Sequence, residues 1–238
     1  MTHKGFSYFA SGVNYFWNAC KSTTNRQRFD ENKAAAQFYL VRHGETDFNR
    51  KGIIQGRGVD MSINENGIKQ AKAFFQQYKD AGFLKVYFSS LIRTRQTIQY
   101  FLDEGIASES SRLIDEMDWG IYEGKENTNE LKKIFATYLQ SWKNGQYNLG
   151  APEGETPLEL QARLKQFIAQ IESADENKIL ICTHGRALRV LLCIFLELPL
   201  SQMDHFPHQN LCVYKLVFRN GKYNLILSND TSHLYEKA

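Results

Sequence analysis

The chain has few cysteines and none of the paired spacings that cysteine chemistry usually requires. Its four cysteines, at positions 20, 182, 193 and 212 of 238 residues, lie far apart and form no Cys-x-x-Cys pair. Three of them fall in apolar stretches typical of strand or helix interiors. We therefore expect buried, reduced thiols in a cytoplasmic protein. A chain of this length buries enough apolar surface to be stable without disulfides or a structural metal.

Long apolar runs are also missing. No segment reaches the roughly 18 uncharged apolar residues needed to cross a bilayer, because Arg189 and Glu197 interrupt the most hydrophobic stretch, residues 187–200. The aromatic stretch near the N-terminus is interrupted by Asn14 and Asn18 and lacks a continuous apolar centre. We expect neither a membrane span nor a cleaved secretory signal.

Neither sign of charge dominates the chain. Its 29 basic and 26 acidic residues leave a net charge of +3, whereas a nucleic-acid-binding protein usually concentrates more positive charge on one face. A small basic cluster, Lys85, Arg93 and Arg95, suits a phosphate group better than a nucleic acid. We expect no nucleic-acid partner.

The first 36 residues differ in pattern from the rest. Apolar and aromatic residues recur there at spacings of three and four, the period of one helix face, and a polar stretch over 21–33 follows as a linker. We predict a helical extension over 1–36 that packs its aromatic face on the main domain, which covers 37–238. A membrane-surface helix is the alternative, but few Lys or Arg lie on the opposite face. The aromatic face contains Phe6, Phe9, Val13, Phe16, Trp17 and Cys20.

From Gln37 onward, strand patterns alternate with helical periodicity. This alternation predicts an α/β fold with a mostly parallel central sheet flanked by helices on both faces. Asn220-Gly221 lies between two apolar runs and predicts a C-terminal antiparallel hairpin. The predicted strands cover 37–41, 85–90 and 178–183, and the predicted helices cover 93–102 and 127–143 and begin near Glu65 and Pro157.

The helix near residue 65 has the clearest start and stop signals. Ser62 and Glu65 form a capping-box pair, and Gly82 is placed to end the helical segment. Its apolar spacing predicts an inner face made of Ile68, Ala71, Phe75 and Tyr78.

Two predicted strands end in the same dipeptide, His-Gly. His43 follows the first strand and His184 follows the strand at 178–183. Ligands of open α/β sheets bind beyond the carboxyl ends of the strands, so we expect the two histidines to meet at one site. Gly44 and Gly185 permit close backbone approach to a ligand, and their N–H groups can face an anion.

Two arginines are expected at the same edge of the sheet. Arg42 adjoins His43, and Arg93 opens the helix after the second strand. Guanidinium groups bind phosphate through several planar donors, and nearby positive charge disfavours protonation of a histidine. Such a pocket would hold a phosphoryl group for in-line attack by a neutral His43.

With these residues the sequence resembles the histidine phosphatase superfamily, which has the phosphoglycerate mutase-like fold. The matching motifs recur in the family's order over nearly all of 37–218. They are Val-Arg-His-Gly-Glu-Thr at 41–46, Asn49, Gln55-Gly56, SSLIRTRQT at 89–97, IDEMDWGIYEG at 114–124, PEGET at 152–156, THG at 183–185 and Asn210.

The resemblance implies a histidine acid/base phosphatase, a phosphomonoesterase that needs no metal and no other cofactor. His43 would attack phosphorus and form a phosphohistidine. Glu116 would protonate the leaving alcohol and then act as base when water cleaves the intermediate. Asp115 and Asp118 stay open as rivals of Glu116 because they lie in the same acidic run.

The resemblance also implies a set of phosphate- and substrate-binding residues, with a small phosphorylated metabolite as the substrate. His184 would bind the transferring group as part of the catalytic set, and Asn49 would add a donor to a phosphate oxygen. The complete substrate-binding set is Arg42, Asn49, Gln55, Arg93 and Gly185.

Some polar residues have simpler interpretations. Glu155 is expected to cap the helix after Pro157, since acidic side chains favour a first helical turn. His205 and His208 are expected to be surface or loop histidines rather than metal ligands. The segment 125–150 is expected to pack as a peripheral helix and also to contact the rest of the substrate.

Other functions stay open. A cofactor-dependent phosphoglycerate mutase is the main alternative, but such mutases have a longer insertion than residues 125–151 and tend to have Gln-Ser in place of Glu45-Thr46. A non-catalytic phospho-ligand binding module is favoured less, because every residue of the implied mechanism is present. Sugar bisphosphates, phosphoglycerates and α-ribazole phosphate are all candidate substrates. The sequence does not exclude a homodimer.

Overall fold

A computed structural model describes residues 35–235. Residues 1–34 of the aromatic helical extension that the sequence predicts over 1–36 lie outside these described residues. Within them, no helix combines the length and the apolar character that a bilayer span requires.

Residues 35–235 form a six-stranded mixed sheet. The strands are β1 (Ala36–Arg42), β2 (Lys85–Ser89), β3 (Ser108–Ser111), β4 (Lys178–Thr183), β5 (Val213–Arg219) and β6 (Lys222–Asp230). Their order across the sheet is β3-β2-β4-β1-β5-β6. The first four in this order pair in parallel, and β5 pairs antiparallel with both β1 and β6. The predicted fold class, with its C-terminal antiparallel hairpin, is confirmed.

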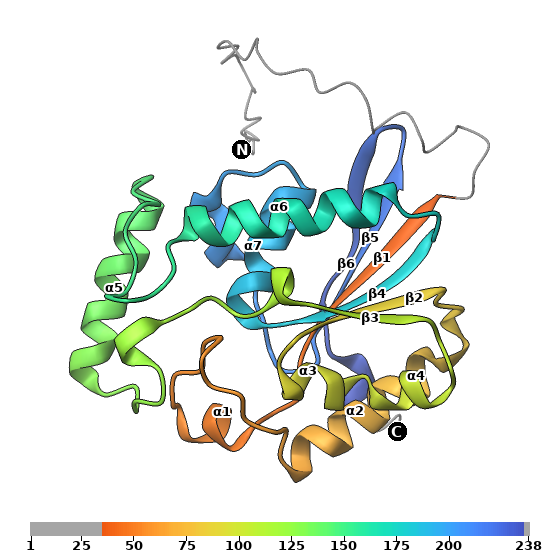
Figure 1. The fold of residues 1–238 in the computed structure, drawn as a ribbon, viewed down its shortest axis with the longest axis horizontal. Helices are drawn as coiled ribbons and strands as arrows, with labels where there is room; N and C mark the ends of the chain where they lie inside the picture. Colours follow the sequence, from red (N-terminus) through yellow and green to blue (C-terminus); the bar gives the residue numbers. More distant parts are fainter. Residues whose placement is uncertain (1–34, 236–238) are drawn as a thin grey trace, which may run out of the picture.

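Helices cover both faces of the sheet, with α6 and α7 above it and α2, α3 and α4 below it in Figure 1. Alternate residues of a strand point to opposite faces, and β1 shows the consequence. Phe38 and Leu40 are buried in the core beneath α6 and α7, while Tyr39 and Val41 are buried with α2 and α4. The helices are α1 (Asp47–Lys51), α2 (Glu65–Tyr78), α3 (Ile92–Thr97), α4 (Gln99–Asp103), α5 (Asn129–Lys143), α6 (Pro157–Ser173) and α7 (Gly185–Phe195).

Helix α2 differs in detail from its predicted form. Its N-cap is Asn64, whose side chain accepts a hydrogen bond from the Gly67 N–H, so the predicted capping role of Ser62 is wrong. The inner face is rotated as well. Phe74 is fully buried, whereas Ile68, which the spacing placed inside, is 50% exposed.

Two other segments also depart from prediction. The helix predicted over 93–102 is divided into α3 and α4 at Ile98, whose φ of −102° and ψ of 9° are not helical. Strand β3 was not predicted, because its sequence Ser-Glu-Ser-Ser has no apolar residue and forms an exposed edge. Short turns of 3-10 helix, η3 (Arg112–Ile114) and η4 (Gly120–Tyr122), follow β3.

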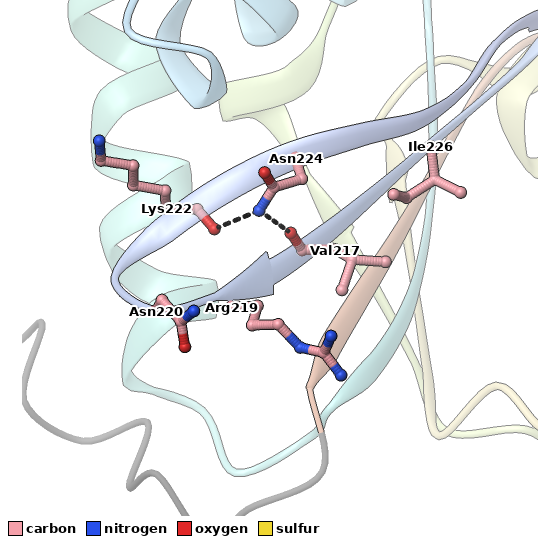
Figure 2. Close-up of a pocket in the computed structure, with 6 residues that line it drawn as sticks. All are labelled: Val217, Arg219, Asn220, Lys222, Asn224 and Ile226. Atoms are coloured by element: carbon pink, nitrogen blue, oxygen red, sulfur yellow. Dashed lines mark hydrogen bonds between the residues drawn. The ribbon is translucent and has the colours of Figure 1, made fainter.

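The hairpin of β5 and β6 turns at Asn220 and Gly221, which both have positive φ, as a two-residue hairpin turn requires. A hollow of about 440 Å³ lies beside this turn. Figure 2 shows the residues that line it, with Asn224 hydrogen-bonded to the carbonyl groups of Val217 and Lys222. Because Val217 pairs with Gln37 near the start of β1, this hollow lies at the opposite end of the strand from His43, about 20 Å away.

Candidate active site

The register of two neighbouring strands brings the histidines together. β1 and β4 are parallel, and Arg42 pairs with Thr183, so the next residue of each strand is a histidine. The His43 N–H donates to the Thr183 carbonyl oxygen at 3.0 Å and extends the pairing by one residue. The ring centroids of His43 and His184 lie 5.1 Å apart, and both residues are buried. The predicted meeting of the two histidines is therefore present in the structure.

The ring of His43 is held in one orientation by the glycine that follows it. Its Nδ1 lies 2.7 Å from the Gly44 carbonyl oxygen. A carbonyl oxygen only accepts hydrogen bonds, so Nδ1 carries the proton and Nε2 keeps its lone pair. Burial, together with the positive charges of Arg93 and Arg42, holds the pKa of His43 well below its usual value of 6.5. The ring is neutral at physiological pH, with a free nucleophilic nitrogen.

His184 is held in the opposite tautomer. Arg93 donates from Nε to Nδ1 of His184 at 3.1 Å, and an arginine side chain only donates. His184 must therefore carry its proton on Nε2, which lies 2.7 Å from Ser89 Oγ. Burial, then the charge of Arg93, keeps the pKa of His184 well below its usual value. Because both ring nitrogens are engaged, a contact between His184 and phosphate requires one of these bonds to open.

The guanidinium group of Arg93 is completely buried between backbone and His184. Its Nη1 donates to the Val59 carbonyl oxygen at 2.7 Å, and its Nη2 donates to the Gly56 carbonyl oxygen at 3.1 Å. Burial lowers the pKa of Arg93, and the negative charge of Glu116 opposes that effect. The site therefore contains a desolvated, rigidly held positive charge beside the second histidine.

Arg42 has an unused donor in the same site. Its Nη1 donates to the His208 carbonyl oxygen at 2.6 Å, but its buried Nε has no hydrogen-bond partner among residues 35–235. Gly185 leaves space beside this Nε because it has no side chain. A Cβ atom at position 185 would lie 3.6 Å from Arg42 Nε and only 2.5 Å from the His208 ring. A buried donor without a partner is costly, and an oxygen of a bound anion would satisfy it.

Glu116 is held at the N-terminus of α7. Its carboxylate accepts hydrogen bonds from the backbone N–H groups of Met117 (2.8 Å), Arg186 (3.2 Å) and Ala187 (3.1 Å). The residue is only 8% exposed, and its charge acts on both Arg42 and Arg93. A carboxyl group thus lies beside the cationic pair, as predicted.

The two acidic rivals of Glu116 have structural bonds of their own. Asp115 accepts hydrogen bonds from the N–H and the hydroxyl of Ser90. Asp118 accepts from the Gly120 N–H at 2.8 Å. Glu116 makes structural bonds too, but its charge acts on both Arg42 and Arg93, and this position favours it as the carboxyl group for chemistry.

Asn49 and Gln55, two predicted substrate ligands, are tied together through Thr46. Asn49 Oδ1 accepts from the Thr46 N–H as part of the cap of α1, and Gln55 Nε2 donates to Thr46 Oγ1 at 2.8 Å. Asn210 donates to Asn49 Oδ1 and to the His43 carbonyl oxygen. Asn49 Oδ1 therefore supports the loop after β1, and the phosphate-binding roles of Asn49 and Gln55 stay predictions.

The prediction that Glu155 caps α6 is wrong. Thr156 and Glu159 form the capping box of that helix. Glu155 instead makes a bidentate ion pair with Arg163, at 2.6 Å from Nε and 2.8 Å from Nη2. No motif or periodicity in the sequence indicates this pair, whose members are eight residues apart.

His208 and Ser89 are site residues that the sequence reasoning missed. His208 does lie in a loop, as expected, but its ring abuts Gly185 and its backbone binds Arg42. Burial lowers its pKa to about 2, with smaller effects from the arginines around it. Ser89 stands in the quoted SSLIRTRQT motif, and its position as the last residue of β2 was the available signal.

An aromatic cluster beside the site includes the region of α5. Trp119 contacts Phe135 and Trp142, with ring centroids 5.1 and 6.2 Å apart. The guanidinium group of Arg186 lies 5.2 Å from the centroid of Trp142. The expected packing of this segment is present, while its contact with substrate stays a prediction.

Comparison with known proteins agrees with this geometry. A sequence profile described as "Histidine phosphatase superfamily (branch 1)" matches residues 38–231. The chain belongs to the histidine phosphatase superfamily. Within the superfamily, a protein of Erwinia tasmaniensis named "Probable phosphoglycerate mutase GpmB" is 30% identical over 209 residues, which cover 85% of this chain and 96% of that relative.

Solved structures of superfamily members have the same architecture. The α-ribazole phosphatase from Shigella flexneri is 26% identical, with a TM-score of 0.71 over 82% of this chain and 96% of that chain. A phosphoserine phosphatase mutant from Entamoeba histolytica, in complex with phosphoserine, has a TM-score of 0.72 at 24% identity over 84% of this chain and 99% of that chain. The similar proteins thus include phosphatases as well as a protein named as a mutase.

Proposed function

We propose that this member of the superfamily is a metal-independent phosphatase that hydrolyses small phosphorylated metabolites through a phosphohistidine at His43. The observation that carries the proposal is the orientation of the His43 ring. Its Nδ1–H is used by Gly44, so the Nε2 lone pair is left for attack on phosphorus, with Arg42 and the buried Arg93 nearby. The low pKa of His43, caused first by burial, keeps that lone pair free of a proton.

The reaction would take place in two displacements. His43 Nε2 attacks phosphorus while the bond from phosphorus to the alcohol oxygen breaks, and Glu116 in its acid form gives that oxygen a proton. Water then attacks the phosphohistidine, Glu116 takes a proton from the water, and the P–N bond breaks to regenerate His43. Arg42 and Arg93 would stabilise the negative charge of the transferring group, the task that Mg²⁺ performs elsewhere.

The setting of this activity is part of the proposal. We place the enzyme in the cytoplasm, with residues 37–238 as the phosphatase domain and 1–36 as an extension. Cys182, Cys193 and Cys212 are buried and free, which is consistent with a reducing compartment.

A phosphate-release assay on a panel of phosphorylated metabolites tests the proposal. The assay contains EDTA and is repeated with His43→Ala. Release by the unaltered enzyme that persists in EDTA and disappears in the variant supports the mechanism. Release that survives in His43→Ala contradicts it.

A phosphoglycerate mutase is the second candidate, favoured by the 30% identity to the relative from Erwinia tasmaniensis. A mutase would interconvert 3- and 2-phosphoglycerate faster than it releases phosphate. The same panel, analysed for both products, separates the two functions.

A further inference from the structure

The loop that carries Glu116 has no regular structure of its own. Residues 115–119 lie between the short turns η3 and η4 and belong to no helix or strand. The amides of α7 hold the carboxylate, but they do not fix the backbone from which the side chain extends. The position of that backbone must come from other segments.

Arg163, from the middle of α6, donates hydrogen bonds to the backbone at and before Glu116. Its Nη1 donates to the carbonyl oxygens of Leu113 (2.8 Å) and Asp115 (2.9 Å), and its Nη2 donates to that of Glu116 (3.0 Å). Its side chain is only 11% exposed. One guanidinium group therefore links a rigid helix to three carbonyl groups around the loop.

Glu155 aligns this guanidinium group from the other side. The bidentate ion pair uses Nε and Nη2 of Arg163, so all three nitrogens of the group are engaged. Glu155 also binds the loop directly, because its backbone N–H donates to the Asp118 carbonyl oxygen at 2.9 Å. The pair is almost completely buried, which makes its geometry well defined.

We propose that Arg163, aligned by Glu155, is a positioning residue that places the Glu116 carboxyl group for proton transfer to the leaving alcohol. The inference rests on the proposed function. Proton transfer requires the carboxyl group within hydrogen-bond distance of the leaving oxygen, and small displacements of such a group reduce the rate strongly. A lysine at 163 would keep the charge but has no planar fork, so it would not bridge three carbonyl groups and a carboxylate at once.

The test compares two leaving groups. p-Nitrophenolate leaves without a proton, whereas the alkoxide of a simple alkyl phosphate needs one. We expect Arg163→Lys to lower kcat/KM for the alkyl phosphate by about 30-fold, less than the roughly 10²–10⁴-fold that general-acid catalysis itself contributes. The loss for p-nitrophenyl phosphate should be no more than about threefold. Glu116→Gln should show the same selectivity. Glu155→Gln should show it more weakly, and it serves as the readout if Arg163→Lys does not fold.

Phe167→Leu is the matched control. Phe167 is fully buried on the same helix, so its truncation weakens α6 without removing the guanidinium group, and both substrates should be affected equally. Equal losses on the two substrates in Arg163→Lys and Glu155→Gln would overturn the positioning role. If His43→Ala hydrolyses both substrates like the unaltered enzyme, the proposed function itself fails. This outcome can be told apart from failure of the positioning role, which is read from the ratio of activities on the two substrates.

Discussion

His43 and His184 follow directly on neighbouring parallel strands, whereas Glu116 lies on a loop without regular structure. The backbone of each histidine continues a buried strand, and the pairing of Arg42 with Thr183 sets their separation. Glu116 depends instead on the amides of α7 and on side chains from distant segments.

The difference separates two ways of building one site. The strand side of the site contains His43 and His184, whose positions are set by the register of β1 and β4. Single substitutions there should affect chemistry or hydrogen bonding locally. The loop side contains Glu116 on residues 115–119, and the position of its carboxyl group depends on a few polar contacts. Substitutions at those distant contacts should therefore change one chemical step selectively. The following predictions probe the two sides.

The largest effect is expected on the strand side, from removal of the nucleophile. His43→Ala should reduce kcat/KM by at least about 10⁴-fold, as losses of catalytic nucleophiles do, while the fold is kept. Steady-state kinetics on any accepted phosphomonoester measures the loss. His205→Ala, at an exposed histidine, is the control and should have normal activity. A modest loss in His43→Ala would indicate a different nucleophile.

The corresponding change on the loop side is Glu116→Gln. We expect a loss of about 10²–10⁴-fold on alkyl phosphates, because the leaving alcohol then receives no proton from a carboxyl group. The matched substitution Asp118→Asn should have a much smaller effect, since the Asp118 side chain accepts a hydrogen bond from the Gly120 N–H at the end of its own loop. Equal losses in the two variants would leave the general acid unassigned.

Ser89→Ala tests how the strand side holds the second histidine. The variant leaves the buried Nε2–H of His184 without its acceptor, and an unpaired buried donor costs about 1–3 kcal/mol. Urea unfolding should show a loss of stability in that range. Ser90→Ala removes a hydroxyl that binds Asp115 on the loop side and should cost less, because the Ser90 N–H still binds the same carboxylate.

An effect on stability of similar size is expected from a change of pH. Unfolded histidines bind protons below about pH 6.5, whereas burial and neighbouring arginines keep His43 and His184 neutral in the folded state to much lower pH. The unfolded state then binds more protons, so stability falls as pH decreases below about 6.5, by about 1.4 kcal/mol per pH unit for each histidine. Urea unfolding at pH 7.5, 6.5 and 5.5 measures the slope, and His43→Gln should reduce it. A flat profile would contradict the buried neutral state.

The strand side was largely predictable from sequence for a physical reason. Buried parallel strands are continuous apolar runs, and ligands bind at their carboxyl ends, so His43 and His184 could be placed together before any coordinates. Helix α2 shows the limit of such patterns. Phe74 and Phe75 are adjacent and both are buried. The helical spacing placed Phe75 and Ile68 on the inner face and left out Phe74, but Ile68 is half exposed.

The loop side was less predictable, because its contacts join residues far apart in sequence and carry no periodic signal. Arg163 looks like an ordinary polar residue of an amphipathic helix, and Glu155 looks like a helix cap. Their pairing depends on how α6 lies over η3, which only the folded chain defines. His208 was missed for the same reason, since its neighbours Arg42 and Gly185 come from two other segments.

The most direct test of the central claim is to trap the phosphorylated enzyme and locate the phosphorus. The enzyme is mixed with a ³²P-labelled substrate, quenched in alkali, in which phosphohistidine is stable, and digested for mass spectrometry and NMR assignment of the modified nitrogen. Our account predicts phosphorus on Nε2 of His43 and no trapped label in His43→Ala. Label on another residue, or on Nδ1 of His43, would contradict it.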